Sequence, residues 1–474
     1  MAPLNLTQFS QFSQNSIIDY ITPETLLPVE GIEDPSTAEN DSPDASSSAS
    51  ASATGGSHVN KNKKRVEPHY EELAPVEDSY AAHLAKRAVP VQQKNTVQDM
   101  VVLSQAKNTI VELLPNIYQY DPAGGKGNTV YIVDTGATPG NKEYTGMPGT
   151  KRWLWPGFGP TPDKDMDDKI GHGTCVLSKT ASPSYGVAKN VDVVVVKLQA
   201  DRNGGGFGIL SAAFMDALLE IRKDIEDNKL QGKAVLNFSF GIQLEDKDPN
   251  KATIKRLLKE MAAMDVPMTV ASGNSARDPA RKDIDRYPAL FAQDIDGIIN
   301  VGAVDNLGSR AEFSQGGPLL HISAPGVKIY CANSTGDWKR GSGTSYAAPQ
   351  VAGLIAYFMS LPGNGLGTIG SGEIPKNAKN LLINSASYPR KSNGDNVLWN
   401  MQSVDCGSGP VRPGHIPRKR DGKGSCSVSA STSISGVTAT ASTSVSRTGV
   451  SSTAVSTTLG TGTSSAPSTS SAIC

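Results

Sequence analysis

The sequence predicts an α/β fold with a mostly parallel central sheet and helices on both faces. Two observations lead to this prediction. Between about residues 115 and 400, short β-rich apolar runs alternate with longer helical patterns, and such alternation is typical of a parallel sheet covered by helices. Several runs, above all VDVVVVKL at 191–198, are continuously apolar. Continuous apolar runs are typical of strands buried on both faces.

Five strands and four helices are expected within this region. The strands are expected at 129–134, 191–198, 234–240, 266–271 and 298–304. The helices are expected at 209–229, 252–264, 345–360 and 375–385. In the second helix, apolar residues recur every three or four positions and form one stripe; they are Ile254, Leu257, Leu258 and Met261. In such sheets, functional residues gather at the carboxyl ends of the strands.

Composition predicts that the rest of the chain contributes little to a core. Residues 1–114 read as a polar, largely disordered leader or a degenerate pro-region, with a low-complexity run at 36–57. Residues 401–424 read as a basic linker, and 425–474 as a disordered tail with 28 Ser or Thr in 50 positions. Such segments bury too little apolar surface to offset the entropy of ordering. The tail fits an O-glycosylated stalk and a plain flexible tail equally well.

Charge and cysteine content exclude several classes of protein. Lys and Arg number 45 against 46 Asp and Glu, which excludes a strongly basic nucleic-acid binder. No stretch approaches 18 consecutive apolar residues, so no membrane span is predicted. The five cysteines leave at least one unpaired thiol or an intermolecular partner, and none has metal-site spacing. No cofactor is expected, and calcium as a structural ion is the alternative left open. The N-terminal residues have no basic or apolar region and do not read as a signal peptide.

Two candidate catalytic residues, a carboxylate and an imidazole, lie at a predicted strand end and in a glycine-flanked motif. In VYIVDTG an apolar run ends in Asp134, and a buried carboxylate at a strand end needs a partner. In GHGTCVLS, His172 lies between two glycines that leave the imidazole uncovered. Of six histidines, only His172 and His321 lie in the folded region. The plainer interpretations are a turn-forming Asp and a structural His.

A hydroxyl and an amide complete the set of candidates. In GSGTSYAAPQ, Ser345 follows a glycine-rich turn and opens an apolar helix, where the helix dipole and backbone N–H groups favour a nucleophile. The plainer interpretation is an N-cap serine. Pro349 is expected in the first turn of this helix, where its missing N–H costs little. In ASGNSA, Asn274 stands on a glycine turn after a buried strand, where its amide is placed to donate to an oxyanion.

Together, Asp134, His172 and Ser345 are the three groups of an activated hydroxyl nucleophile: the orienting carboxylate, the base and the hydroxyl. The chain order Asp, His, Ser is that of subtilisin and differs from the orders in chymotrypsin and the α/β-hydrolases. With its flanking residues, the sequence resembles the subtilisin-like serine proteases (subtilases), on their proteinase K-like fungal side. Four motifs within about 115–400 carry the resemblance: Asp134-Thr135-Gly136, Gly171-His172-Gly173-Thr174, Ser272-Gly273-Asn274 and Gly343-Thr344-Ser345-Tyr346-Ala347-Ala348-Pro349.

The resemblance implies a three-layer subtilisin-like fold and a serine endopeptidase that works through an acyl-enzyme. Ser345 is then the nucleophile, His172 the base and Asp134 its orienting partner, while Asn274 and the Ser345 N–H form the oxyanion hole. A polypeptide substrate is expected to extend along backbone segments of the cleft, with broad specificity. The residues expected there are Gly204, Gly205, Gly206, Phe238, Ser239, Phe240, Gly241, Ser272 and Gly273. The family also implies an extracellular or secretory-route monomer, with a prodomain or inhibitor among its partners.

Three residues depart from the family's usual pattern. Cys175 and Gln350 stand where the family usually has histidine, after HGT and after Ala-Pro. Cys175 is either a thiol sensitive to mercurials or a small buried apolar residue. His321 stands where proteinase K-like enzymes usually have a calcium-binding Asp, so calcium is not expected at that position. In the leader, Lys86-Arg87 resembles a dibasic processing site, although a chance pair is the plainer interpretation.

Two other functions compete with the peptidase. The Ser/Thr-rich tail and the lack of an evident prodomain fit a catalytically inactive, wall-associated or binding protein. The same triad also serves esterases and amidases, although an extended-peptide cleft favours a protease. The GGGFG run at 204–208 has a plainer interpretation as well, a flexible surface loop.

Overall fold

The structure, a computed structural model, describes residues 26–30, 89–104, 115–156, 166–198, 200–203, 206–391, 394–402, 419–420 and 426–427. The predictions for the low-complexity run, the dibasic pair, most of the basic linker and nearly all of the tail lie outside these residues. Within the described ranges, no helix is both long enough and apolar enough to cross a bilayer.

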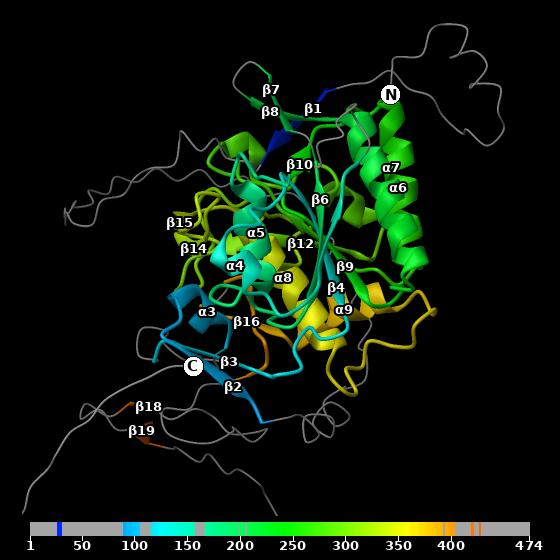
Figure 1. Ribbon diagram of the computed structural model, residues 1–474. Helices are drawn as coiled ribbons and strands as arrows, with labels where there is room; N and C mark the ends of the chain where they lie inside the picture. Colours follow the sequence, from blue (N-terminus) through cyan, green and yellow to red (C-terminus); the bar gives the residue numbers. More distant parts are fainter. Residues whose placement is uncertain are drawn as a thin grey trace, which may run out of the picture. The chain divides into compact units, whose positions relative to one another are not determined.

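A nine-stranded sheet lies at the centre of the fold (Figure 1). The strand order is β16-β17-β13-β12-β11-β9-β4-β6-β5, and every neighbouring pair is parallel except β16 with β17. The bounds are Thr129–Asp134 (β4), Lys151–Leu154 (β5), Asp192–Lys197 (β6), Ala234–Phe238 (β9), Met268–Ala271 (β11), Ile298–Val304 (β12), Ile322–Pro325 (β13), Ser387–Pro389 (β16) and Asn396–Leu398 (β17). The predicted α/β class with a mostly parallel sheet is confirmed, and the five predicted strands are among these nine.

Helices cover both faces of this sheet, which explains why its central strands are continuously apolar. The strand β4 shows the division. Val130 and Ile132 pack in one core with α5 and α8, whereas Tyr131 and Val133 pack in a second core with α6 and α7. The helix bounds are His172–Ala181 (α5), Ser211–Asp227 (α6), Pro249–Ala263 (α7), Thr344–Met359 (α8) and Ile374–Asn384 (α9). The fold therefore has three layers, helices, sheet and helices, with one core on each face of the sheet.

The four predicted helices form, with differences of a few residues at their ends. The helix α7 begins after Asp248, whose side chain accepts the N–H of Asn250 at 2.8 Å. Its predicted apolar stripe is buried in the second core; the residues are Ile254, Leu257, Leu258 and Met261. The helix α8 lies inside the fold, and every residue of it up to Phe358 is buried. Its apolar character on all sides follows from this position.

A second sheet has the strand order β10-β1-β8-β7. Its strands are Leu26–Glu30 (β1), Ala200–Asn203 (β7), Gly206–Leu210 (β8) and Gly241–Ile242 (β10). The strand β1 belongs to the predicted leader, and it pairs antiparallel with β8 on one side and with β10 on the other (Figure 1). This sheet therefore joins a segment near the start of the chain to two strands that lie before and after β9 in sequence.

Residues ahead of position 115, where the sequence places the start of the peptidase domain, also pack into the core. Two short elements lie in this part of the chain, Val91–Lys94 (β2) and Gln98–Leu103 (α3). The strand β2 pairs antiparallel with Ile117–Tyr120 (β3), which follows position 115. Met100 and Leu103 are fully buried in the core that contains α5 and α8. Asp99 forms a buried ion pair with Lys179 of α5. The remaining short elements are α4 (Lys142–Thr145), η3 (Pro279–Arg281), η4 (Ala289–Gln293), β14 (Ile329–Ala332), β15 (Trp338–Gly341), β18 (Lys419–Arg420) and β19 (Cys426–Ser427).

A disulfide joins Cys175 of α5 to Cys331 of β14, with Cα atoms 5.0 Å apart. Both residues are fully buried. The interpretation of Cys175 as a reactive thiol is therefore wrong. The interpretation as a small buried residue is confirmed for its burial, but it did not include the bond to Cys331. Five cysteines allow many pairings, so the sequence alone did not identify this one.

Candidate active site

The predicted site residues meet at the carboxyl ends of three neighbouring strands. Asp134 is the last residue of β4, Ser239 follows β9, and Asn274 lies shortly after β11. These strands are adjacent in the order β11-β9-β4. His172 and Ser345 lie in the first turns of α5 and α8. Because parallel strands end at one edge of the sheet, residues far apart in sequence come together there.

Asp134 and His172 form a buried hydrogen-bonded pair. Asp134 Oδ1 lies 2.7 Å from His172 Nδ1, and each residue is 1% exposed. The same oxygen accepts the N–H of Thr135 at 2.8 Å. With Nδ1 bonded to a carboxylate, the neutral imidazole carries its proton on that nitrogen. The other ring nitrogen, Nε2, is then the basic one.

A close approach between α5 and the end of β4 makes this pair possible. A side-chain carbon at Gly173 would lie 2.2 Å from the Gly136 carbonyl oxygen and 3.1 Å from Asp134 Oδ1. The Gly173 N–H also donates to Thr135 Oγ1 at 2.9 Å. Only glycine lets the first turn of α5 lie this close to the strand, and this explains one glycine of the Gly-His-Gly motif.

Asp168, which is not among the residues that the sequence analysis singles out, organises the same junction. It is buried, and its Oδ1 accepts the Thr135 hydroxyl and the Gly171 N–H, each at 2.8 Å. Its Oδ2 accepts the N–H and the hydroxyl of Thr174, each at 2.7 Å. Since Gly171 and Thr174 lie at the N-terminus of α5, the helix dipole also favours a carboxylate there. The available signal was an acidic residue just before a helix start.

Ser345 is positioned through its backbone. The helix α8 begins at Thr344, so Pro349 is its sixth residue, and its predicted place in the first turn is wrong. Because proline has no N–H, the Ser345 carbonyl lacks the donor that a helix normally provides four residues later. Ser239 Oγ donates to that carbonyl at 2.7 Å and accepts Asn237 Nδ2 at 2.8 Å. The end of β9 thereby holds the backbone of the candidate nucleophile.

Three polar atoms at the centre of the site are buried without a hydrogen-bond partner in the described part of the chain. They are Asp134 Oδ2, His172 Nε2 and Ser345 Oγ. Buried polar atoms are normally paired, so such exceptions need an explanation. The rings of His172 and Tyr346, the residue after Ser345, lie with their centroids 5.5 Å apart. The helices α5 and α8 therefore bring base and hydroxyl together without closing a hydrogen bond, as is common before a substrate binds.

Asn274 lies beside Ser345. Its Oδ1 accepts the N–H and the hydroxyl of Thr344, each at 2.9 Å. A side-chain carbon at Gly343 would lie 3.0 Å from Ser345 Oγ and 3.5 Å from Asn274 Nδ2. Glycine at this position therefore keeps a space open between the hydroxyl and the amide nitrogen. A space of this kind, next to a nucleophile and a donor, suits a developing oxyanion.

Comparison with known proteins agrees with this geometry. The model of the subtilase family matches residues 125–409, more than half of the chain. The chain belongs to the subtilase family. A subtilisin-like protease 3 of Pseudogymnoascus destructans is 34% identical over 285 residues, which are 60% of this chain and 64% of that protein. A cuticle-degrading serine protease of Arthrobotrys oligospora is 33% identical over 250 residues, which are 52% of this chain and 55% of that protein. The matches thus span less than two thirds of each relative's length.

A solved structure shares the fold of this subtilase. A cold-adapted subtilisin-like serine proteinase matches with a TM-score of 0.51 at 25% identity, over 65% of this chain and 100% of that chain. The subtilisin-like fold that the resemblance implied is confirmed.

The FSFG segment of the subtilase, predicted to bind substrate, points its side chains inward. Phe238 and Phe240 are fully buried and pack edge-on against Phe214 of α6. Ser239 lies between them and points to the opposite side of the segment, where its hydroxyl donates to the Ser345 carbonyl. The alternation follows from the period of two along a strand. Only the main chain of this segment is therefore available to hydrogen-bond with a peptide. Its role in substrate binding stays a prediction.

Ser272 and Gly273 lie in the turn that carries Asn274. Ser272 Oγ donates to the Gln315 carbonyl at 2.8 Å, and the Gly273 N–H donates to Thr344 Oγ1 at 3.2 Å. Both contacts fix the turn against its neighbours. The predicted residues Gly204 and Gly205 lie outside the described residues.

Gly206 and Gly241, two further predicted substrate residues, lie at the starts of β8 and β10. The strand β1 runs between these two strands. In its register, Val29 opposes Phe207 of β8 and Glu30 opposes Gly241 of β10. A segment of the chain's own leader thus lies as an extended strand along the backbone predicted for substrate.

The residues that depart from the family pattern have internal hydrogen-bonding roles. Gln350 Nε2 donates to the Pro325 carbonyl at 2.7 Å and so ties α8 to the end of β13. His321 Nδ1 accepts the Asn300 N–H at 2.9 Å. Burial, with the charge of Lys379, lowers the pKa of His321 to about 3, so this imidazole is a neutral acceptor. No three His, Cys, Asp or Glu side chains gather as a metal site in the described ranges, and the expected lack of a cofactor or of calcium stays a prediction.

Proposed function

We propose that this subtilase is a serine endopeptidase that hydrolyses peptide bonds through an acyl-enzyme. One observation carries the proposal: His172 is bonded to Asp134 through Nδ1, while His172 Nε2 and Ser345 Oγ are buried nearby without partners. A base and a hydroxyl in this state are poised for proton transfer once a substrate brings them together. Membership of the subtilase family supports the same activity.

The proposed reaction moves one proton back and forth through His172. Ser345 Oγ attacks the peptide carbonyl carbon while its proton passes to His172 Nε2, and Asp134 stabilises the imidazolium through Nδ1–H. The imidazolium then gives the proton to the leaving amine, which breaks the C–N bond and leaves an ester on Ser345. Water attacks this ester and gives a proton to the same nitrogen. That proton returns to Ser345 Oγ when the acid product leaves.

Asn274 and the backbone N–H of Ser345 are the proposed oxyanion donors. The two hydrogen bonds from Thr344 to Asn274 Oδ1 set the orientation of the amide. The space that Gly343 keeps open lies between Asn274 Nδ2 and Ser345 Oγ. Loss of one such donor costs on the order of 10²–10³ in kcat. Asn274→Ala is therefore expected to lower kcat by that factor.

We propose a polypeptide substrate that binds in extended form with broad specificity. The two strands β8 and β10 accept an extended partner strand through main-chain hydrogen bonds, and such bonds carry little sequence information. The burial of Phe238 and Phe240 removes two side chains that otherwise would select residues. The fungal relatives and the Ser/Thr-rich tail support an exported enzyme.

Labelling with a fluorophosphonate tests the assembled site. Wild-type protein should take up the probe and cleave casein, and Ser345→Ala should do neither. Folded wild type that takes up no probe and cleaves nothing would favour the alternative, an inactive wall-associated or binding protein. Turnover of esters without turnover of peptides would favour an esterase.

We also propose that the leader segment β1 is an internal inhibitor of this activity. The support is its register: Leu26–Glu30 pairs with both strands on which an extended substrate would bind. A tethered strand competes with substrate at high effective concentration.

Val29→Pro tests the inhibitory strand, because proline removes the N–H of a residue that opposes both neighbouring strands. The variant should hydrolyse a peptide substrate faster than wild type at low substrate concentration, with a lower apparent KM. Ser48→Pro, in the low-complexity run of the same leader, is the matched control and should change nothing. Equal rates for Val29→Pro and wild type would refute an inhibitory role for β1.

A further inference from the structure

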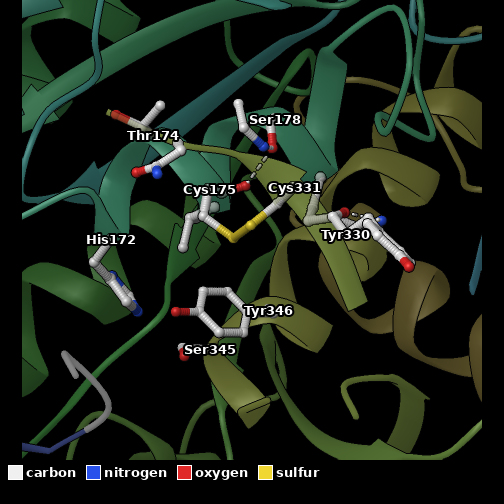
Figure 2. The surroundings of a disulfide bond; sticks show 12 residues. His172, Thr174, Cys175, Ser178, Tyr330, Cys331, Ser345 and Tyr346 are labelled. Carbon is white, nitrogen blue, oxygen red and sulfur yellow. Dashed lines mark hydrogen bonds between the residues drawn. A yellow bond between two sulfur atoms is a disulfide. The ribbon is translucent and has the colours of Figure 1, made fainter. Parts of the chain in front are cut away.

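The disulfide belongs to the framework of the active site. Cys175 lies in the first turn of α5, three residues after His172, and residues at this spacing lie on the same side of a helix. Its partner Cys331 lies in β14. Figure 2 shows the disulfide between α5 and β14, with His172, Ser345 and Tyr346 in its surroundings.

The hairpin that contains Cys331 leads directly to the nucleophile. β14 pairs antiparallel with β15, and β15 ends at Gly341, shortly before α8 begins at Thr344. The base of the hairpin is closed, because the Lys328 N–H donates to Ser342 Oγ at 2.9 Å and the Gly343 N–H to the Gly326 carbonyl at 2.8 Å. A displacement of β14 would therefore be passed to the start of α8.

Three consecutive residues of β14 are each linked to α5. The links are Lys179 Nζ to the Tyr330 carbonyl at 3.4 Å, the Cys175–Cys331 disulfide, and the Ala332 N–H to Ser178 Oγ at 3.0 Å. Ser178 Oγ in turn donates to the Cys175 carbonyl at 2.7 Å. We call this set of three links the α5–β14 seam. The disulfide is its covalent centre.

We infer that the α5–β14 seam, through its disulfide, is a positioning element that holds His172 within reach of Ser345. His172 Nε2 and Ser345 Oγ make no hydrogen bond with each other, so their distance depends on how α5 is placed relative to α8. The seam ties the helix of the base to the hairpin that leads into the helix of the nucleophile. This inference rests on the proposed peptidase function.

A second link holds the other end of the same helix pair. Thr180 Oγ1, near the end of α5, donates to the Pro349 carbonyl of α8 at 3.2 Å. Asp168 and Thr135 hold the first turn of α5 against the end of β4, so without the seam α5 can still shift relative to the hairpin that leads into α8. The disulfide, located next to His172, removes that freedom. A misplacement of about 1 Å costs up to about 10² in rate, and it acts on kcat because the peptide-binding strands lie elsewhere.

The double variant Cys175→Ala/Cys331→Ala tests the inference. Its kcat for a peptide substrate should fall about 10- to 100-fold, with KM changed less than about threefold. The second-order rate of fluorophosphonate labelling should fall in parallel, since that reaction needs His172 and Ser345 but no peptide. Wild type measured beside it must cleave and take up label; if it does neither, the proposed peptidase function fails, not the positioning role.

Leu258→Ala is the matched control, because Leu258 is fully buried on α7 in the other core. It lowers stability without touching the seam, so its kcat should equal that of wild type at a temperature where both are folded. A folded double variant whose kcat stays within twofold of wild type would overturn the inference. If the double variant does not fold, Ser178→Ala removes a hydrogen-bonded link and keeps the disulfide. It should lower kcat severalfold, and an unchanged kcat there would overturn the inference equally.

Discussion

At the scale of single residues, the site depends on buried groups that never meet substrate. Asp168 is the clearest of them, because its two oxygens receive donors from the end of β4 and from the first turn of α5. It thereby fixes the place of His172 relative to Asp134 without contacting either side chain. Asp168 is therefore a positioning residue. Replacing it with asparagine removes the negative charge and keeps the size and shape of the side chain.

Asp168→Asn should lower kcat about 10- to 100-fold with a smaller change in KM. The amide nitrogen of asparagine would face either the N–H and hydroxyl of Thr174 or the Gly171 N–H and the Thr135 hydroxyl. Hydrogen bonds would be lost there, so α5 would shift. Steady-state kinetics on a peptide substrate measure the effect. Asp167→Asn, at the exposed neighbouring position, is the control and should keep wild-type kinetics. If both variants keep wild-type kcat, Asp168 has no positioning role.

Individual residues differ in how readily the sequence reveals them. Asp134, His172 and Ser345 interrupt or open apolar runs, and a polar residue in an apolar run is visible without a structure. Asp168 and Ser239 act on atoms of other elements, so their roles follow from the fold. The sequence around Asp168 offers only the weak signal of an acidic residue before a helix start. The Cys175–Cys331 pair spans 156 residues, and pairing at that separation follows only from the fold.

At the scale of elements, α8 contains a proline near Ser345, the proposed nucleophile. Pro349 takes away the helical donor of the Ser345 carbonyl, and Ser239 supplies another from the end of β9. Pro349 and Ser239 therefore act on the same atom, the Ser345 carbonyl oxygen. Their free-energy contributions should be coupled, which a double-mutant cycle can measure.

Ser239→Ala should lower the free energy of unfolding by about 1–3 kcal/mol, because it leaves the buried Ser345 carbonyl without a donor. In Ser239→Ala/Pro349→Ala the alanine N–H at position 349 can bond that carbonyl. The double variant should therefore lose less than the sum of the single losses, by about 1 kcal/mol or more. Urea unfolding of the four proteins gives the coupling free energy. Additive losses would mean that Ser239 and Pro349 act independently.

Long apolar runs and amphipathic helices are predictable from sequence, and short elements are not. The five strands and four helices expected from the pattern all form. Strands such as β13 and β17 are only four and three residues long, too short for their periodicity to stand out. The strand β1 lies in a polar leader, and it is a strand only through its pairing with β8 and β10.

At the scale of the whole molecule, a buried neutral histidine predicts loss of stability in acid. Burial and Lys379 lower the pKa of His321 from 6.5 to about 3. Between those values the unfolded chain binds the extra proton, so stability rises with pH through this window and falls as pH drops from 6.5 toward 3. The slope from this residue is at most about 1.4 kcal/mol per pH unit.

His321→Gln keeps an acceptor for the Asn300 N–H but does not titrate. Urea unfolding from pH 7 to pH 4 should therefore show a shallower loss of stability for this variant than for wild type. Equal pH slopes in the two proteins would show that His321 contributes nothing to acid sensitivity. Because other groups titrate in both proteins, only the difference between the slopes is diagnostic.

The folded unit begins earlier in the chain than the composition predicts. Sequence composition places its start at 115, yet Met100 and Leu103 are buried in the core and Asp99 pairs with the buried Lys179. Removing this segment exposes apolar surface worth about 1.5–3 kcal/mol per side chain. It also leaves the Lys179 ammonium without its carboxylate, at about 3–5 kcal/mol.

A chain that starts at residue 105 should therefore be less stable by about 6 kcal/mol or more than one that starts at residue 89, by urea unfolding. Adding Lys179→Met to the shorter chain removes the unpaired buried charge and should recover part of the loss. The same substitution in the longer chain should destabilise it, because Asp99 then lacks its partner. Equal stability of the two unsubstituted chains would place residues 89–104 outside the cooperative unit, and the core would then begin where composition alone puts it.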